Sequence, residues 1–190
     1  MKASEKISLL RTEMKARGVD HLLVPSDDYH MSEYVSDFFR ARAYLSGFTG
    51  SAGTLIVSMN EAKLFTDGRY YIQAERQLAG SGIDLMRAGS EGVPTVEEYV
   101  TSIVKNDETL AFDGRCVSAS TYEKLKKNLP NAKFVVDVDF PALVWPDRPA
   151  LPCGRIWKLD QKYAGKTHAE KLADLRAKLK DNDCGATVLT

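Results

Sequence analysis

The first part of the chain alternates apolar and polar residues with the period of a helix and then becomes wholly apolar. Apolar side chains recur three and four residues apart at Ile7, Leu10 and Met14. With Ser4 as the N-cap and Gly18 as a stop, this spacing predicts a helix over residues 4–17. The following run His-Leu-Leu-Val predicts a buried strand, which Pro25 closes.

Short strand-like runs then alternate with amphipathic stretches. The runs that predict strands are residues 54–58, 62–66, 83–87, 109–113 and 133–138. The stretches that predict helices are residues 69–79, 95–104 and 118–129. Thr95 and Glu98 form a capping-box pattern at the start of one helix, while Gly80 and Gly82 end another. Only Met-Asn-Glu separates the first two runs, so these strands are expected to form an antiparallel hairpin.

This alternation predicts the α/β fold class, with a mixed β-sheet flanked by helices, because the hairpin adds an antiparallel pair to an otherwise parallel order. The alternation stops at Val144, and we therefore assign residues 1–144 to one domain. Residues 145–165 contain a proline-rich stretch that is typical of a stiff linker. Residues 166–190 are expected to open a second domain.

The start of the chain is repeated near its end. Residues 5–25 align without gaps with residues 170–190, at a shift of 165 positions. The identical pairs are Glu5/Glu170, Lys6/Lys171, Leu10/Leu175, Arg11/Arg176 and Lys15/Lys180, and the pairs Ile7/Leu172 and Met14/Leu179 keep the apolar face. Thr167 and Glu170 form a second capping box. This repeat predicts the first helix and strand of a second, similar domain, and therefore a longer parent polypeptide, because a lone helix and strand cannot bury their apolar faces. Chance similarity between lysine-rich helices is the alternative.

Charge and composition exclude several classes of function. The 190 residues include 26 basic and 26 acidic side chains, so the chain has no long-range attraction for nucleic acid or for an anionic membrane. No apolar run approaches the roughly 20 residues that span a bilayer, and the charged N-terminus does not match a secretory signal. Cys116, Cys153 and Cys184 lack the spacing of a metal or redox motif and are expected to be free thiols of a cytoplasmic protein.

The stretch Gly-Phe-Thr-Gly-Ser-Ala-Gly-Thr at residues 47–54 suggests a phosphate-binding loop, but its surroundings do not fit one. A Walker loop requires Gly-Lys-Ser/Thr, which does not follow here, and a dinucleotide-binding turn leads into a helix, whereas this stretch leads into a strand. We therefore interpret Gly47, Gly50 and Gly53 as a structural loop, in which glycine permits positive φ angles and close approach of the backbone.

The sequence Thr-Asp-Gly-Arg-Tyr at residues 66–70 joins a predicted strand to a predicted helix. Asp67 and Gly68 suit the turn, and Asp67 is placed to cap the helix that follows. Arg69 and Tyr70 then lie at the helix start, where an exposed guanidinium can bind a carboxylate. The alternative for Arg69 is an ion pair or a solvated side chain.

Other groups of chemically active residues give weaker signals. Asp27, Asp28, His30 and Glu33 fall within seven residues and suggest a divalent metal site, but carboxylate-rich loops are usually only solvated. Arginine and aromatic residues alternate over residues 38–48, as in sites for single-stranded nucleic acid, yet the neutral charge favours a core-edge or interface role. The Gly-x-Ser-x-Gly elbow of serine hydrolases is absent from the sequence. No catalytic residue and no metal ligand is therefore assigned to this chain.

In their order and spacing, the motifs resemble the front of the three-domain Xaa-Pro aminopeptidases, in the aminopeptidase P, prolidase and creatinase family. They are Ser-Glu-Tyr at 32–34, Arg-Ala-Arg at 40–42, the glycine loop at 47–54, Thr-Asp-Gly-Arg-Tyr-Tyr-Ile-Gln-Ala at 66–74, Asp-Arg-Pro-Ala-Leu-Pro at 147–152 and Tyr-Ala-Gly-Lys-Thr at 163–167. Asp28, His30 and Ser32 also satisfy an Asp-x-His-x-Ser-Glu-Tyr spacing. The resemblance covers practically the whole chain.

The resemblance implies a division of labour between domains. In this family an N-terminal α/β domain precedes, in the three-domain members, a second domain of like fold and a C-terminal catalytic domain. That last domain holds two divalent metal ions, typically manganese, which activate a water to attack the bond before a proline in second position. The resemblance thus implies a non-catalytic N-terminal domain of a cytoplasmic enzyme. Its implied partners are its own C-terminal catalytic domain and a second copy in a homodimer, and the implied substrates of the parent are peptides with proline in second position.

The resemblance also suggests a role for the glycine loop and its neighbours, because N-terminal residues of some relatives overhang the mouth of the active site. Arg69, Tyr70, Phe48 and Arg42 are the candidates for such a rim, with internal packing or a fixed ion pair as the alternative for each. The alternative function is a stand-alone module that binds a peptide or an anion through the glycine loop and Arg69. Creatinase-like amidine hydrolysis by the parent is a third possibility.

Overall fold

The computed structural model describes residues 1–189, which fall into two compact units. The first unit runs from Met1 to Pro152, and the second begins at Cys153. Each unit is described by itself. Across these residues, no helix has both the length and the apolar character needed to cross a membrane.

The elements of the first unit lie close to the predicted ranges. In chain order they are α1 (Ala3–Ala16), β1 (His21–Val24), the 3₁₀ turn η1 (Asp37–Phe39), α2 (Ala41–Ser46), β2 (Thr54–Ser58), β3 (Ala62–Thr66), α3 (Tyr71–Leu78), β4 (Asp84–Arg87), α4 (Val96–Ile103), β5 (Thr109–Ala111), α5 (Ala119–Asn128), β6 (Lys133–Val135) and α6 (Phe140–Val144). The periodicity does not predict η1, α2 or α6. Elements of one or two turns are too short to produce a periodic pattern.

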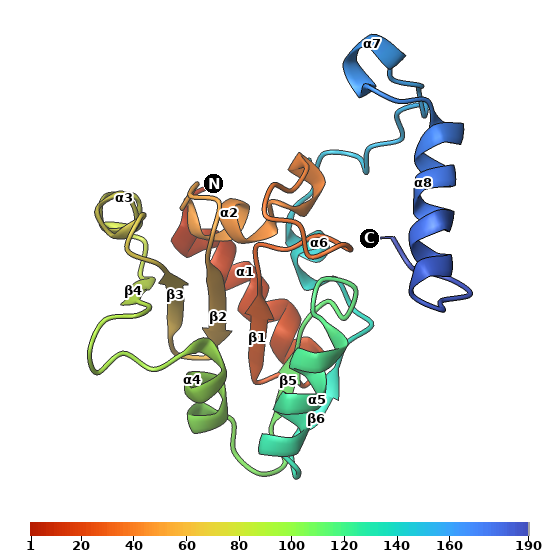
Figure 1. The fold of residues 1–190 in the computed structure, drawn as a ribbon. Helices are drawn as coiled ribbons and strands as arrows, with labels where there is room; N and C mark the ends of the chain where they lie inside the picture. The colour runs from red at the N-terminus through yellow and green to blue at the C-terminus, as the bar shows by residue number, and fades with distance from the viewer. Residues whose placement is uncertain (190) are drawn as a thin grey trace. The chain divides into compact units, whose positions relative to one another are not determined.

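The strands form one six-stranded sheet in the order β4-β3-β2-β1-β5-β6 (Figure 1). The central strand β1 is antiparallel to β2 and parallel to β5. β2 and β3 form the expected antiparallel hairpin, whereas β4 runs parallel to β3 and β6 runs parallel to β5. The predicted mixed sheet is thus confirmed. From β1 the chain builds outward to β4 and then returns to place β5 on the other side of β1.

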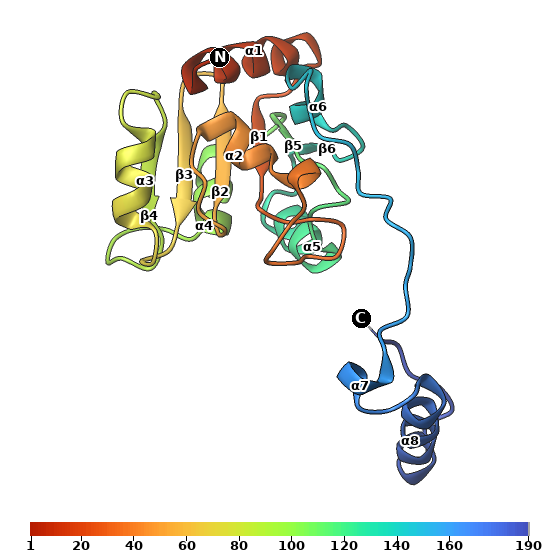
Figure 2. The same ribbon diagram turned by 90° about the horizontal axis from the view of Figure 1, so that it is seen from above.

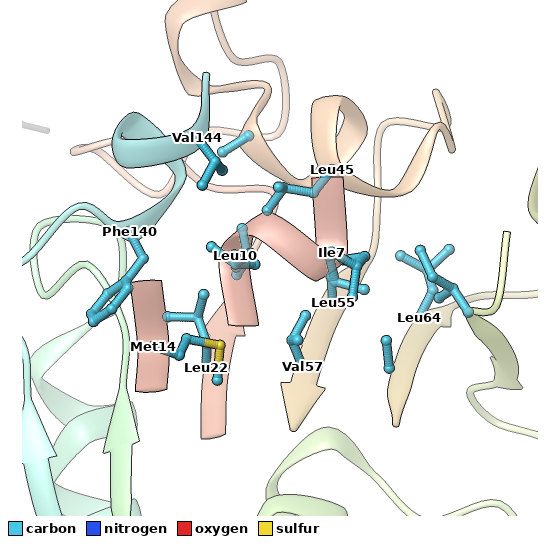
Figure 3. Close-up of a cluster of buried hydrophobic side chains, with 14 of the residues drawn as sticks. Ile7, Leu10, Met14, Leu22, Leu45, Leu55, Val57, Leu64, Phe140 and Val144 are labelled. Carbon is cyan, nitrogen blue, oxygen red and sulfur yellow. The ribbon is translucent and has the colours of Figure 1, made fainter. Parts of the chain in front are cut away.

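Helices cover both faces of the sheet (Figure 2). α1, α2 and α6 pack on one face, and α4 and α5 contribute the apolar side chains of the other. On the first face, Ile7, Leu10 and Met14 of α1 point toward Leu22 of β1 and Leu55 of β2 (Figure 3). The three α1 side chains are buried, as their helical spacing predicts. Side chains that leave water in this way supply most of the free energy that holds such layers together.

Helix α1 begins one residue earlier than expected, at Ala3, with Lys2 as its N-cap and Ser4 inside the helix. The Glu5 carboxylate accepts a hydrogen bond from the Lys2 N–H at 2.8 Å, so it performs the reciprocal half of a capping box. Gly18 ends the helix as predicted, because its φ of 64° is the left-handed conformation that glycine adopts without a Cβ clash.

The segment that follows α6 is attached to the first unit. The rings of Trp145 and Tyr44 stack with their centroids 4.3 Å apart. Arg148 donates from Nε to the Phe38 carbonyl at 2.8 Å and from Nη1 to the Asp139 carboxylate at 2.6 Å. Residues 145–148, which their proline content places in the predicted linker, therefore pack against the domain that precedes them.

The second unit contains α7 (Gln161–Ala164) and α8 (His168–Asp181). The predicted capping box opens α8, because the Thr167 N–H donates to Glu170 Oε2 at 2.7 Å and the Glu170 N–H donates to Thr167 Oγ1 at 3.2 Å. None of the α8 side chains is buried within this unit. The strand expected after α8 is not formed over residues 185–189, since no neighbouring strand in the unit can pair with it.

Candidate functional site

The carboxyl edge of the sheet gathers the segments in which sequence analysis places candidate residues. β1, β3 and β5 run in the same direction, so the loops that follow Val24, Thr66 and Ala111 all leave from this edge. The glycine loop joins them there, because it leads into the antiparallel strand β2. Loops at the carboxyl edge of an α/β sheet are where such folds bind their ligands.

The glycine loop is held by the guanidinium of Arg42, which projects from α2. Arg42 Nη1 donates to the Phe48 carbonyl at 2.6 Å, and Nη2 donates to the Gly50 carbonyl. Its Nε donates to Ser26 Oγ at 2.9 Å, and that hydroxyl in turn donates to the Gly53 carbonyl at 2.6 Å. One planar fork therefore fixes the path of the loop through its backbone oxygens.

Two of the three loop glycines are required by close packing, and the third by its backbone angle. A Cβ on Gly50 would lie 2.3 Å from Cζ of Phe48, and a Cβ on Gly53 would lie 2.8 Å from the carbonyl oxygen of Phe65. Gly47 has φ 77° where it ends α2. The loop is thus tightly packed scaffold.

Arg42 and Phe48 lie inside the domain. Phe48 is fully buried, and Arg42 is only 5% exposed. Among residues 1–189 no carboxylate forms an ion pair with Arg42, whose acceptors are neutral carbonyls and a hydroxyl. Burial lowers the pKa of Arg42 to about 10, which still leaves it charged at neutral pH. For both residues the structure shows internal packing, the alternative that the sequence left open.

Arg69 and Tyr70 lie closer to the surface, next to the loop. The Asp67 carboxylate accepts from the Arg69 backbone N–H at 3.0 Å, from Nε at 2.9 Å and from Nη2 at 2.8 Å. This bidentate contact lowers the pKa of Asp67 and raises that of Arg69, whose side chain is 61% exposed. Asp67 therefore closes a turn with Arg69 and does not cap α3, which begins only at Tyr71. Gly68 lies open at the tip of this turn.

Tyr70 connects this turn to the glycine loop. Its hydroxyl lies 2.8 Å from Ser51 Oγ, and its ring meets the Phe48 ring edge-on with centroids 5.9 Å apart. The neighbouring guanidinium of Arg69 has a second carboxylate close to it, since its Nη1 lies 3.8 Å from the Glu33 carboxylate. The structure therefore brings Arg69 and Tyr70 to the same edge as the glycine loop, with only the guanidinium of Arg69 widely accessible.

Sequence analysis missed a second copy of the same turn. Asp113, Gly114 and Arg115 follow β5, and the Asp113 carboxylate accepts from Arg115 N, Nε and Nη2 at 3.0, 2.9 and 2.8 Å, the distances seen between Asp67 and Arg69. The Arg115 side chain is 56% exposed. The recurrence of Asp-Gly-Arg directly after a strand was the available signal.

The residues that suggest a metal site do not converge. Asp28 accepts from the backbone N–H groups of His30 and Ser32, which lowers its pKa and fits a turn. Glu33 lines a hollow of about 150 Å³ together with Arg42 and Gly50. No group of three His, Cys, Asp or Glu side chains within the described chain is arranged to hold a metal ion. The residues present therefore do not fit a site for two divalent ions.

A buried polar contact at the opposite edge was also missed. His21 Nδ1 lies 2.8 Å from Ser58 Oγ, and its Nε2 lies 3.0 Å from the Glu108 carboxylate. The arrangement has the residue types of a hydrolytic triad. His21 and Ser58 are each 8% exposed, however, so we interpret the contact as structural.

Comparisons with known proteins agree with this architecture. The sequence profile of the creatinase/prolidase N-terminal domain matches residues 6–145, and a second profile of the same description matches residues 147–190. Aminopeptidase P2 of Arabidopsis thaliana is 39% identical over 98% of this chain, and a probable Xaa-Pro aminopeptidase P of Penicillium rubens is 40% identical over the same share. The chain spans 27% and 31% of the length of these two relatives.

A solved structure shows the same arrangement of elements. The X-prolyl aminopeptidase of Caenorhabditis elegans, described as a cytosolic enzyme with a di-nuclear active site, has a TM-score of 0.83 and 31% sequence identity. The similarity covers 97% of this chain and 32% of that protein. With its matching profile, its six-stranded mixed sheet and its glycine loop at the carboxyl edge, this chain belongs to the creatinase/prolidase N-terminal domain family.

Proposed function

We propose that this chain is the non-catalytic N-terminal part of a cytoplasmic Xaa-Pro aminopeptidase. The observation that carries the proposal is that relatives with this activity in their names match 98% of the chain, while the chain spans 27% and 31% of their length. The di-nuclear site of such an enzyme, with manganese as the expected metal, then belongs to a C-terminal domain that partners this one.

The direct test is hydrolysis of an Xaa-Pro peptide. The purified chain of 190 residues should show no turnover with excess Mn²⁺, whereas the full-length parent should be active under the same conditions and lose activity with a chelator. Metal-dependent, proline-specific turnover by the pure chain would overturn the proposal. No observation favours the stand-alone peptide- or anion-binding module, and the aminopeptidase names of the relatives give no support to amidine hydrolysis.

The same proposal gives the carboxyl edge a role in shaping access to the active site of the parent. Arg69 is its main candidate residue, because its guanidinium is pre-oriented by Asp67 and still exposed. Arg69→Ala in the parent should raise KM or change the preferred peptide length, with little change in stability. Arg115→Ala is a matched control, since its turn has the same geometry after a different strand. Equal kinetics for both variants would reduce Arg69 to scaffold.

We also propose that residues 166–190 begin a second domain of like fold, after a linker that starts beyond the packed residues 145–148. The profile match over 147–190 and the aligned repeat support this division. Leu172, Leu175 and Leu179 then take the places of Ile7, Leu10 and Met14 on a second sheet. Amide hydrogen exchange tests the idea: α8 should exchange rapidly in the 190-residue chain and slowly in the parent. Equally rapid exchange in both would contradict it.

The parent is further proposed to be a homodimer, as the family resemblance implies. Light scattering on the full-length protein measures its mass directly. A monomeric mass at micromolar concentration would remove this part of the proposal without affecting the others.

A further inference from the structure

The sheet changes direction of winding between β1 and β5. The chain leaves the carboxyl end of β1 toward α2, on one face, and leaves the carboxyl end of β5 toward α5, on the opposite face (Figure 2). β1 and β5 are adjacent and parallel, with His21 opposite Leu110. Loops that diverge to opposite faces leave a crevice between them, and open α/β sheets bind ligands at such switch points.

A groove of about 330 Å³ lies at this switch point. Its walls are largely apolar, with Leu23 and Pro25 from the end of β1, Met31 from the loop beyond it and Val117 from the loop after β5. A smaller cavity of about 30 Å³ shares Leu23, Pro25 and Asp27 with the groove and continues it toward Arg148. The groove has the volume of a small-ligand site and an apolar lining with few polar groups.

Asp27 gives the groove an uncompensated negative charge. Among residues 1–189, no donor forms a hydrogen bond or ion pair with its half-buried carboxylate, and burial, with a smaller effect of Asp28, raises its pKa. The two other carboxylates that line the smaller cavity already form ion pairs, Asp113 with Arg115 and Asp139 with Arg148. Asp27 is thus the charge that a ligand with a cationic group would neutralise.

We propose that this groove binds the side chain of a lysine or arginine that a protein partner presents, with its methylene stem against Leu23, Pro25 and Val117 and its cationic head on the Asp27 carboxylate. Such a side chain combines an apolar stem with a terminal charge, which matches a largely apolar groove lined by an unpaired carboxylate. Anionic ligands would face the Asp27 charge, and a bare metal ion would lack further ligands at this place. The inference goes beyond the proposed function and does not depend on it, because it concerns residues outside the Arg69 turn.

The test is a titration of the intact 190-residue chain, monitored by two-dimensional ¹H–¹⁵N NMR. The probes are the N-acetyl methylamides of lysine and arginine, with the norleucine derivative as the uncharged isostere. The two basic probes should cause saturable shifts at the amides of residues 26–31 and 113–118, and norleucine should cause none. Equal shifts with norleucine would show a purely apolar groove, and absence of saturable shifts with lysine would also overturn the proposal.

Two variants and one pH titration separate binding from structural effects. Asp27→Asn should weaken lysine binding about tenfold or more, the loss expected for a charge-assisted hydrogen bond. Asp137→Asn, which changes an exposed aspartate after β6, should leave binding unchanged. In the unmodified chain, the pKa of Asp27 should fall when the lysine probe is bound, because a nearby cation favours the carboxylate. Wild-type binding by Asp27→Asn, an unmoved pKa, or tighter binding of free putrescine than of the lysine probe would each contradict the assignment.

Discussion

The substitution Gly50→Ala tests whether the glycine loop is rigid scaffold. The added Cβ would lie 2.3 Å from Cζ of Phe48 and 2.8 Å from Cδ1 of Tyr70, both far inside van der Waals contact. Phe48 is fully buried and cannot swing into solvent, so relief of the clash requires the loop or the core to move. Overpacking of this kind typically costs about 1–3 kcal/mol, and we expect the upper end here. At about 2–4 °C per kcal/mol, the melting temperature should fall by roughly 6–12 °C.

Urea unfolding followed by circular dichroism measures this loss directly, with Gly68→Ala as the control. The nearest atom to a Cβ on Gly68 is 3.8 Å away, in the Tyr71 ring, so this variant adds a methyl group without a clash. Where the backbone angles suit alanine, such a change stabilises by about 0.4–1 kcal/mol through the unfolded chain. If Gly50→Ala and Gly68→Ala unfold within about 0.5 kcal/mol of each other, well inside the expected overpacking cost, the loop is not held as described.

Three further predictions concern Cys116, Arg42 and Glu108. Iodoacetamide should modify Cys153 and Cys184 in the native chain but Cys116 only on unfolding, because burial raises the pKa of the Cys116 thiol to about 12. Equal rates of modification at the three cysteines, measured by mass spectrometry of the digested chain, would contradict this. Arg42→Gln should lower the free energy of unfolding by about 2 kcal/mol or more, because two buried carbonyls lose their donors. Arg42→Lys should be destabilised as well, because an ammonium group cannot replace the planar guanidinium. A urea midpoint equal to that of the wild type would refute this role of the Arg42 guanidinium. A backbone hydrogen bond to the Glu108 carboxylate, with His21 contributing less, lowers the pKa of Glu108 in the folded chain. The ionised carboxylate therefore stabilises the fold above the pKa of an unfolded glutamate, about 4.3, and this stabilisation is lost as the pH falls through the lower pKa of the folded chain. Glu108→Gln should therefore lose stability less steeply than the wild type below about pH 4.3, and parallel pH curves would count against this.

The sequence was most informative where the pattern of apolar residues is long enough to repeat. The α1 stripe, the hairpin and the Thr95 capping box all appear in the structure as predicted. The sequence pattern did not predict α2 and α6, because each has only one or two turns and is positioned by packing against α1. Tertiary contacts, which a local pattern does not contain, decide such short elements.

In the candidate site, too, some features could be predicted from the sequence and others could not. An exposed position for Arg69 could be predicted, since a turn after a strand end reaches solvent. The burial of Arg42 could not, because charged side chains are rarely buried and the carbonyls that accept its hydrogen bonds come together only in the folded loop. The groove beside Asp27 depends on the order of strands in the sheet, which no stretch of sequence displays.

The packing of α6 on α1 also affects how the domain is made on the ribosome. Phe140 and Val144 complete the apolar layer around Leu10 and Met14, so the first helix to be synthesised receives its last neighbours from the end of the domain (Figure 3). The central strand β1 likewise waits for β5 before both of its sides are paired. Contacts between residues so far apart in the sequence slow folding. The apolar side chains of the nascent α1 helix therefore stay partly exposed until about 140 residues have emerged, and during this period chaperones can bind them.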